Sequence, residues 1–184
     1  MDKVLYLKFS QHNALRTLLF GTYPAELVYI EPREPFWGRE STGAGRNELG
    51  KSLMRVRERF LEEGMQMTSP PPGWGDGAVM TPILKINGYG EYSGLLYHSP
   101  HSVVYEEDLY PTALHLFLAR KFLDHRPDLA DRIRQCEDVV EVTALSAELA
   151  EFARRDWPHI ALSTVCKSGF HPYFALRACW LYLR

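Results

Sequence analysis

Residues 36–50, FWGRESTGAGRNELG, gather residue types that could hold a phosphorylated ligand. Gly43 and Gly45 let backbone N–H groups approach a phosphate, and a helix that starts after Asn47 would add the positive end of its dipole. Trp37 offers a flat aromatic face to a base or a sugar. A simpler interpretation needs no ligand: the glycines permit tight turns and Asn47 caps the helix. Spacing alone leaves both interpretations open.

Other polar residues also admit two interpretations. Arg46 could bind a phosphate through the paired hydrogen-bond donors of its guanidinium, or be an exposed surface arginine. Glu48 is explained as a first-turn acid that faces the helix dipole. His98 and His101, in HSPH, could suggest a metal pair, but no third ligand is in view. We therefore expect loop histidines and no metal.

Composition points to one ordinary globular domain. The chain has 184 residues, of which 46% are hydrophobic and 24% charged, and a chain of this length can bury a sizeable core. Its formal net charge is −2, so it has no general electrostatic field for nucleic acid or an anionic membrane. An anionic ligand would have to be held by local Arg, Lys and backbone N–H groups.

The sequence also suggests a compartment. No apolar run reaches the roughly 18 residues that a membrane helix needs, and the start, MDKVLYLKFSQH, lacks the features of a signal peptide. Cys136, Cys166 and Cys179 form no paired framework and no C-x-x-C occurs. We expect the reducing environment of the cytoplasm or nucleus.

In the first part of the chain, three helices and a strand are predicted to position the glycine segment. Apolar periodicity and β-forming composition place the helices at 1–9, 12–22 and 48–63, and the strand at 25–31. Asn13 and Asn47 are the expected N-caps, and Gly21 suits the C-terminal stop. The first helix begins without a cap.

A second half follows a segment dense in proline and glycine at 64–82, which we interpret as a linker. Beyond it the pattern predicts strands at 83–87 and 102–107 and helices at 113–123, 127–136, 142–155 and 155–164. Thr112, Pro127 and Asp156 mark three helix starts. The tail at 166–184 fits no regular pattern, and we expect it to pack loosely or not at all.

Two blocks of sequence carry a resemblance to a known family. The first consists of LKFSQHNALRTLLFGT, EPFWG, GAGRNELG and LMRVR, all between residues 7 and 57, and the second of LYHSPHSVVY and YPTALHLFLARKF, between residues 96 and 122. They resemble the late and the early block, respectively, of the NADAR superfamily, also called YbiA-like, which is mainly α-helical. The resemblance implies a mainly α fold with a few short β-strands, formed by a single YbiA-like domain.

The blocks stand here in the reverse of the family's order. This resembles a circular permutation, or a piece excised from two tandem copies. Because chain termini are commonly close in domains, a permuted chain can still close the same core. The implied organisation is a late-block half, a linker, an early-block half of the same domain and an atypical tail, at 1–63, 64–82, 83–165 and 166–184.

The resemblance implies an N-glycosidase that cleaves ribose–base or ADP-ribose–base bonds. Glu34 stands where the family has an acidic residue before its W-G, and it would activate water or stabilise charge at the anomeric carbon. His115 would be the second catalytic residue, although a packed core histidine fits the same helix. The implied substrate-binding residues are Trp37, Gly38, Gly43, Gly45, Arg46, Asn47, Tyr97 and Lys121. No cofactor or metal is implied.

Departures from the family pattern support an alternative. Leu114 and Leu118 replace the family's glutamate and glutamine, and Tyr97 replaces an asparagine. Lys121 is either a phosphate partner or the solvent side of its helix. The alternative is a non-catalytic nucleotide-binding module or a degenerate member.

A nucleotide or an ADP-ribosylated base is the expected partner, and a domain-swapped dimer would complete the helix that is split at Met1. The enzyme hypothesis further expects Trp37 and His115 to share a cleft.

Overall fold

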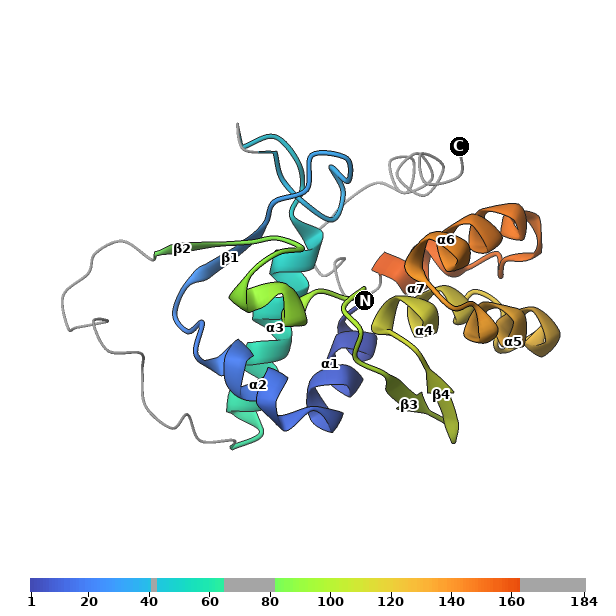
Figure 1. Cartoon of the computed structure of the whole chain (residues 1–184), viewed down its shortest axis with the longest axis horizontal. Helices are drawn as coiled ribbons and strands as arrows, with labels where there is room; N and C mark the ends of the chain where they lie inside the picture. The colour runs from blue at the N-terminus through green and yellow to red at the C-terminus, as the bar shows by residue number, and fades with distance from the viewer. Residues whose placement is uncertain (41–42, 65–81, 163–184) are drawn as a thin grey trace. The chain divides into compact units, whose positions relative to one another are not determined.

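A computed structural model describes residues 1–40, 43–64 and 82–162. It is mainly α-helical with four short strands among these residues (Figure 1), so the predicted fold class is confirmed. The chain divides into an N-terminal unit, Asp2–Ser99, and a C-terminal unit, Pro100–Arg184 together with Met1. The tail expected at 166–184 and nearly all of the 64–82 linker lie outside the described residues.

The described residues of the N-terminal unit form three α-helices, two strands and one 3₁₀ helix. They are α1 (Asp2–Gln11), α2 (Asn13–Phe20), β1 (Glu26–Tyr29), α3 (Glu48–Glu62), β2 (Ile83–Ile86) and η1 (Glu91–Leu95). The apolar residues of the predicted periodicity form the core, in which Leu5, Phe9, Leu27, Leu53 and Phe60 are fully buried. All four regular elements predicted in the first part of the chain are therefore present.

β1 and β2 pair in parallel, with Glu26 opposite Ile83 and Tyr29 opposite Ile86. α3 runs between the two strands in sequence and packs against β1 (Figure 1). Parallel strands require such a crossover, because a tight turn cannot join them. The sheet therefore brings residues that follow position 82 into the unit that contains the glycine segment.

The C-terminal unit places helices after a β-hairpin. Its elements are β3 (Val103–Tyr105), β4 (Asp108–Tyr110), α4 (Ala113–Ala119), α5 (Pro127–Gln135), α6 (Val139–Glu148), η2 (Ala150–Phe152) and α7 (Trp157–Leu162). Thr112 caps α4 by accepting a hydrogen bond from the His115 N–H, and Pro127 opens α5, as predicted.

Several boundaries differ from the prediction for local reasons. The strand predicted through residue 107 ends at Tyr105, because Glu106 and Glu107 have φ values of 50° and 73° and form the turn of the hairpin. α4 ends at Ala119 and is followed by turns, so Lys121 lies after the helix. The helix predicted at 142–155 begins earlier, where Asp138 caps α6, and it ends at Glu148.

Two residues that were predicted to mark the ends of α2, Asn13 and Gly21, do not have the predicted roles. Asn13 is the first helical residue and His12 occupies the N-cap position. Gly21 has φ −59°, so the helix ends without a left-handed residue at that position.

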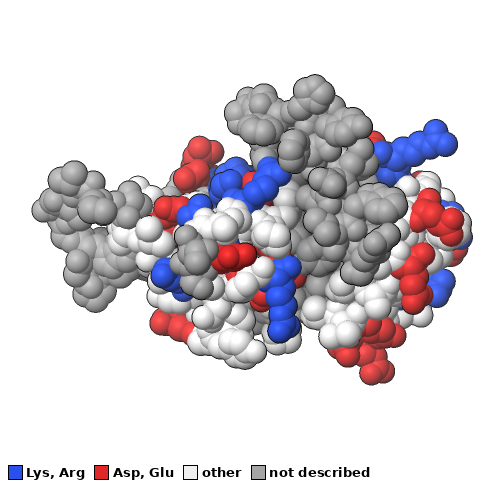
Figure 2. Space-filling view, turned by 90° about the horizontal axis from the view of Figure 1, so that it is seen from above, with Lys and Arg blue, Asp and Glu red and all other residues white. Residues whose placement is uncertain are grey.

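On the face shown in Figure 2, basic and acidic side chains both occur among the described residues. No helix among residues 1–40, 43–64 and 82–162 has the length and apolar character to cross a membrane.

Candidate functional site

Glu34 and Tyr97, both predicted from sequence, meet in the N-terminal unit. The Tyr97 hydroxyl donates a hydrogen bond of 2.8 Å to Glu34 Oε2, across 63 residues of sequence. Tyr97 is buried and Glu34 is half-buried. A hydrogen bond to a carboxylate is stronger than one between neutral groups, so it fixes the orientation of Glu34. One residue of each family-like block therefore contributes to the same contact.

Aromatic rings surround this contact. Trp37 lies with its ring centroid 6.0 Å from that of Tyr97, and the two ring planes are tilted by 45°. Phe36 packs edge-on against Trp37, at 4.9 Å and 86°. Such pairs hold aromatic side chains in defined orientations. We call Glu34, Phe36, Trp37, Tyr97 and His98 the Glu34–Tyr97 cluster.

His98 belongs to the cluster, although the sequence suggested only a loop histidine. Its ring packs edge-on against Tyr97, at 5.1 Å and 90°. Burial lowers the pKa of His98, and the nearby Glu34 carboxylate opposes that shift. Its position directly after Tyr97 was the one sequence signal that could have indicated this ring contact.

The glycine segment is arranged differently from a phosphate-binding loop. The N–H groups of Arg46, Asn47, Glu48 and Leu49 donate to the carbonyls of Pro35, Gly38, Phe36 and Trp37, at 2.7–3.1 Å. The amides at the start of α3 are therefore already used. The expectation that they would face a phosphate is not met, and these bonds instead position Phe36 and Trp37.

Three glycines of the segment allow backbones to approach. A Cβ on Gly45 would lie 2.5 Å from the Gly38 carbonyl oxygen, and one on Gly38 would lie 3.1 Å from backbone atoms of Tyr29 and Glu31. Gly50, in α3, would meet the Leu27 oxygen at 2.1 Å. Gly43 differs, because none of the described residues apart from its chain neighbours lies within 4 Å of its missing Cβ; its φ of +95° is the reason for a glycine there.

Asn47 occupies the N-cap position of α3, but its side chain does not cap the helix. Its φ is 54°, and the side chain reaches β1. There Oδ1 accepts from the Tyr29 N–H at 2.9 Å and Nδ2 donates to the Leu27 carbonyl at 2.8 Å. The predicted N-cap position is therefore confirmed, but the Asn47 side chain joins the helix to the strand and does not cap the helix.

Arg46 is exposed and lies over the Phe36 ring, 4.9 Å from its centroid. It also approaches Glu48 at 3.4 Å, and Lys51 lies 3.2 Å from the same carboxylate oxygen. Glu48 is 2% exposed, and its Oε2 has no hydrogen-bond partner in the described part of the chain. Arg46 thus brings a positive charge next to the aromatic rings of the cluster.

His115 and Lys121 lie in the C-terminal unit, and both contact residues of that unit. His115 is fully buried, and its Nδ1 is 2.9 Å from Thr112 Oγ1. Burial lowers the pKa of His115. Lys121 donates to Ser146 Oγ at 2.7 Å. Trp37 belongs to the other unit, so a cleft shared with His115 stays a prediction.

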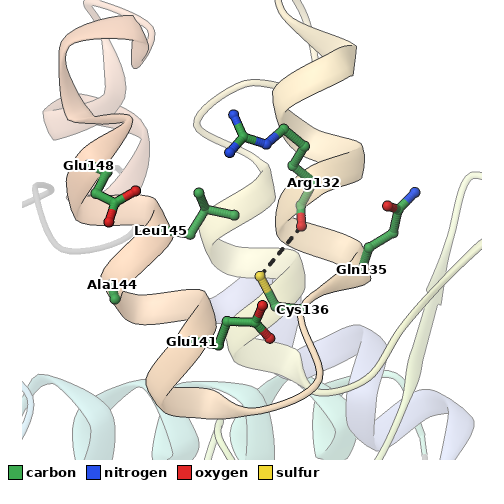
Figure 3. Close-up of a pocket in the computed structure, with 7 residues that line it drawn as sticks. All are labelled: Arg132, Gln135, Cys136, Glu141, Ala144, Leu145 and Glu148. Atoms are coloured by element: carbon green, nitrogen blue, oxygen red, sulfur yellow. Dashed lines mark hydrogen bonds between the residues drawn. The ribbon is translucent and has the colours of Figure 1, made fainter.

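A cavity of about 480 Å³ lies in the C-terminal unit, and it contains none of the residues predicted from sequence. Figure 3 shows Arg132 and Gln135 of α5 on one side and Glu141 and Glu148 of α6 on the other. Cys136 lies between them, and its thiol donates to the Arg132 carbonyl at 3.4 Å. Burial raises the pKa of this thiol, which reduces its reactivity.

A metal site would need several ligands that converge. Among residues 1–40, 43–64 and 82–162, no three His, Cys, Asp or Glu side chains are grouped to hold an ion.

A comparison with family models finds the NADAR domain at residues 1–61. The matched residues include Glu34, Trp37 and the whole glycine segment. The resemblance to the NADAR family is therefore confirmed for the first third of the chain. The permuted order of the blocks stays a prediction.

Relatives with curated names agree with this match. The segment is 44% identical over 63 residues to the N-glycosidase YbiA of Escherichia coli, covering 34% of this chain and 39% of that protein. An N-glycosidase of Nostoc punctiforme is 41% identical over 60 residues, covering 33% and 38%. A riboflavin biosynthesis protein of Vibrio vulnificus is 34% identical over 97 residues, covering 49% and 26%. No solved structure matches the chain significantly.

This chain thus spans about two fifths of the length of the curated N-glycosidases that it matches.

Proposed function

We propose that the protein is an N-glycosidase that hydrolyses the bond between a ribose, or an ADP-ribose, and its base. The observation that carries the proposal is the Tyr97–Glu34 hydrogen bond beside Trp37. Glu34 and Trp37 lie in the segment that matches the NADAR model. The names of the N-glycosidase relatives support the reaction class.

Glu34 is the proposed catalytic carboxylate. Tyr97 occupies its Oε2, so Oε1 is the oxygen that would take a proton from the attacking water. The same carboxylate would stabilise the positive charge that develops at the anomeric carbon as the bond to the base breaks. The departing base would take its proton from solvent water.

Trp37 and Arg46 are proposed to bind the substrate. The Trp37 face would stack on the base or the ribose. The exposed guanidinium of Arg46 would hold a phosphate through paired hydrogen bonds. The backbone amides at the start of α3 already donate to the carbonyls of residues 35–38. The contribution of this segment would therefore be the shape of the loop, which depends on Gly38, Gly43, Gly45 and Asn47.

The second candidate function is nucleotide binding without turnover. It is favoured by the family-like positions in the C-terminal unit, because His115 is buried inside that unit and Lys121 is bonded to Ser146. Leu114 and Leu118 can neither transfer protons nor bind ribose hydroxyls. In this case Trp37 and Arg46 would bind a ligand that Glu34 does not cleave.

Glu34→Gln separates the two functions. We expect the substitution to lower the release of free base from an ADP-ribosylated guanosine or a ribosylaminopyrimidine substrate by roughly 10²–10⁴-fold. Calorimetric binding of the same substrate should persist. Glu62→Gln, at an exposed position of α3, is the matched control and should leave turnover unchanged.

The remaining outcomes are also informative. Binding by the native chain with no release of base would support the binding module. Neither binding nor release, with the whole substrate panel, would overturn both candidates.

A further inference from the structure

Lys8 is a charged residue inside the core of the N-terminal unit. It lies on α1 between apolar neighbours, and its exposed fraction is 0%. A buried ammonium is strongly unfavourable unless hydrogen bonds replace its water. Burial lowers the pKa of Lys8 to about 7. Such a residue needs a structural or functional reason to be a lysine.

Three acceptors satisfy the three N–H donors of this ammonium. Lys8 Nζ donates to the carbonyls of Gly94 and Leu96, at 2.7 and 2.6 Å, and to Ser99 Oγ at 2.6 Å. The acceptors are 86–91 residues away in sequence but lie within six residues of one another. A lysine suits this arrangement, because the donors of an ammonium group surround one nitrogen atom. The donors of an arginine guanidinium lie instead in a planar fork.

Tyr97 lies between these acceptors in the chain. The Leu96 carbonyl belongs to the peptide group that precedes Tyr97, and Ser99 follows two residues later. The Ser99 N–H donates to the Leu96 carbonyl at 3.2 Å, which closes the turn around the ammonium. From this turn the Tyr97 hydroxyl reaches Glu34.

We infer that Lys8 is a positioning residue: by binding the backbone on both sides of Tyr97, it holds the Tyr97 phenol against the Glu34 carboxylate. Among the described residues, Lys8 donates no hydrogen bond to a side-chain atom of Glu34 or Tyr97. Its effect on chemistry therefore passes through the 94–99 turn. The kinetic consequence rests on the proposed N-glycosidase function, whereas the geometric one does not.

The test observes Tyr97 directly in the full chain. The protein is labelled with 3-fluorotyrosine, and the ¹⁹F resonance of Tyr97 is assigned by its absence in Tyr97→Phe. Glu34→Gln should shift this resonance, because it removes the charge that the phenol faces. In a Lys8→Met background we expect the Tyr97 resonance no longer to respond to Glu34→Gln. Lys3 is an exposed lysine of the same helix, and the control substitution Lys3→Met should preserve the response.

Ser99→Ala is the second variant, for the case that Lys8→Met does not fold. It retains Lys8 and removes one of its three acceptors. We therefore expect the Tyr97 resonance to shift less than in Lys8→Met, and to respond to Glu34→Gln more weakly than in the native chain. An unchanged Tyr97 resonance and response in a folded Lys8→Met or Ser99→Ala protein would overturn the inference.

Kinetics distinguish this inference from the proposed function. If base is released, Lys8→Met should lower kcat by roughly 10²-fold, as expected for a misplaced catalytic group, with a smaller change in KM. If no substrate is turned over, the proposed function fails while the ¹⁹F response still decides the role of Lys8. A normal kcat with an unchanged Tyr97 ¹⁹F response in folded Lys8→Met protein would contradict the inference. A normal kcat with a lost ¹⁹F response would instead contradict the catalytic role of Glu34.

Discussion

His115 illustrates at the residue scale how burial decides between two roles. The sequence allowed either a catalyst or a packed core histidine. The ring is fully buried, and Thr112 Oγ1 lies 2.9 Å from its Nδ1. Burial disfavours the charged imidazolium and so lowers the pKa of His115. The packed interpretation is the one that these contacts favour.

This burial predicts a pH dependence of stability. The unfolded state binds a proton near the ordinary histidine pKa of about 6.5, whereas the folded state binds it only at lower pH. The contribution of His115 is therefore fully present above about pH 6.5 and is lost as the pH falls towards the folded-state pKa. The free energy of unfolding should decrease by up to about 1.4 kcal/mol per pH unit for each such group, and His98 acts in the same direction.

Urea unfolding between pH 7.5 and 5.5 measures this dependence. His115→Gln should flatten the slope, and His159→Gln, at an exposed position, should not. An equal slope in native and His115→Gln proteins would show that the histidine does not titrate differently on folding.

At the scale of elements, the contact between α3 and β1 supports the candidate site. Asn47 donates to and accepts from β1, and Gly50 leaves room for the Leu27 carbonyl. The N–H groups that begin α3 bind the carbonyls of residues 35–38. The position of Trp37 and of the loop that carries Glu34 is thus set by the close approach of one helix to one strand.

Gly50→Ala tests this approach. Alanine normally favours a helix by about 1 kcal/mol over glycine, but here its Cβ would lie 2.1 Å from a backbone oxygen, so the helix would have to move. We expect the free energy of unfolding to fall by about 1–3 kcal/mol. Gly88→Ala, where nothing lies within 4 Å, is the control and should change stability by less than about 0.5 kcal/mol. A stabilised Gly50→Ala protein would contradict this packing.

At the scale of the whole molecule, the order of the two family-like blocks is the open issue. Residues 83–99 belong to the same unit as residues 2–64, and they supply β2 and Tyr97 to it. Strand pairing and side-chain contacts depend on position in space and not on chain order. Parts of both blocks therefore meet in one unit, as the permutation hypothesis requires.

A rearranged chain tests the permutation directly. Residues 83–162 would be placed before residues 1–64, which restores the order of the family. We expect a cooperative thermal transition and retention of the Tyr97 ¹⁹F resonance, because the β1–β2 pairing and the Tyr97–Glu34 contact need no particular order. If the native chain folds and the rearranged chain does not, the permutation hypothesis is contradicted. Light scattering of both chains would also test the predicted domain-swapped dimer.

The sequence by itself determined the elements and the family-like segment. Apolar periodicity located α1 and α3, and β-forming composition located β1. Thr112 and Pro127 marked two helix starts, and the W-G and G-x-G-x-N-x-L-G residues indicated the NADAR resemblance. These features depend on residues within a few positions of one another, so local physics predicts them. The turn at Glu106 and Glu107 escaped prediction, because neither residue type is typical of positive φ.

Only the tertiary structure decided how these residues are used. The glycine segment suggested a phosphate loop, but its amides bind the carbonyls of residues 35–38 and its glycines admit backbones from elsewhere in the fold. Asn47 binds β1 and Lys8 binds the turn around Tyr97, across 18–91 residues of sequence. A donor or acceptor takes the partner that packing brings within about 3 Å, and no local pattern specifies which distant group that will be.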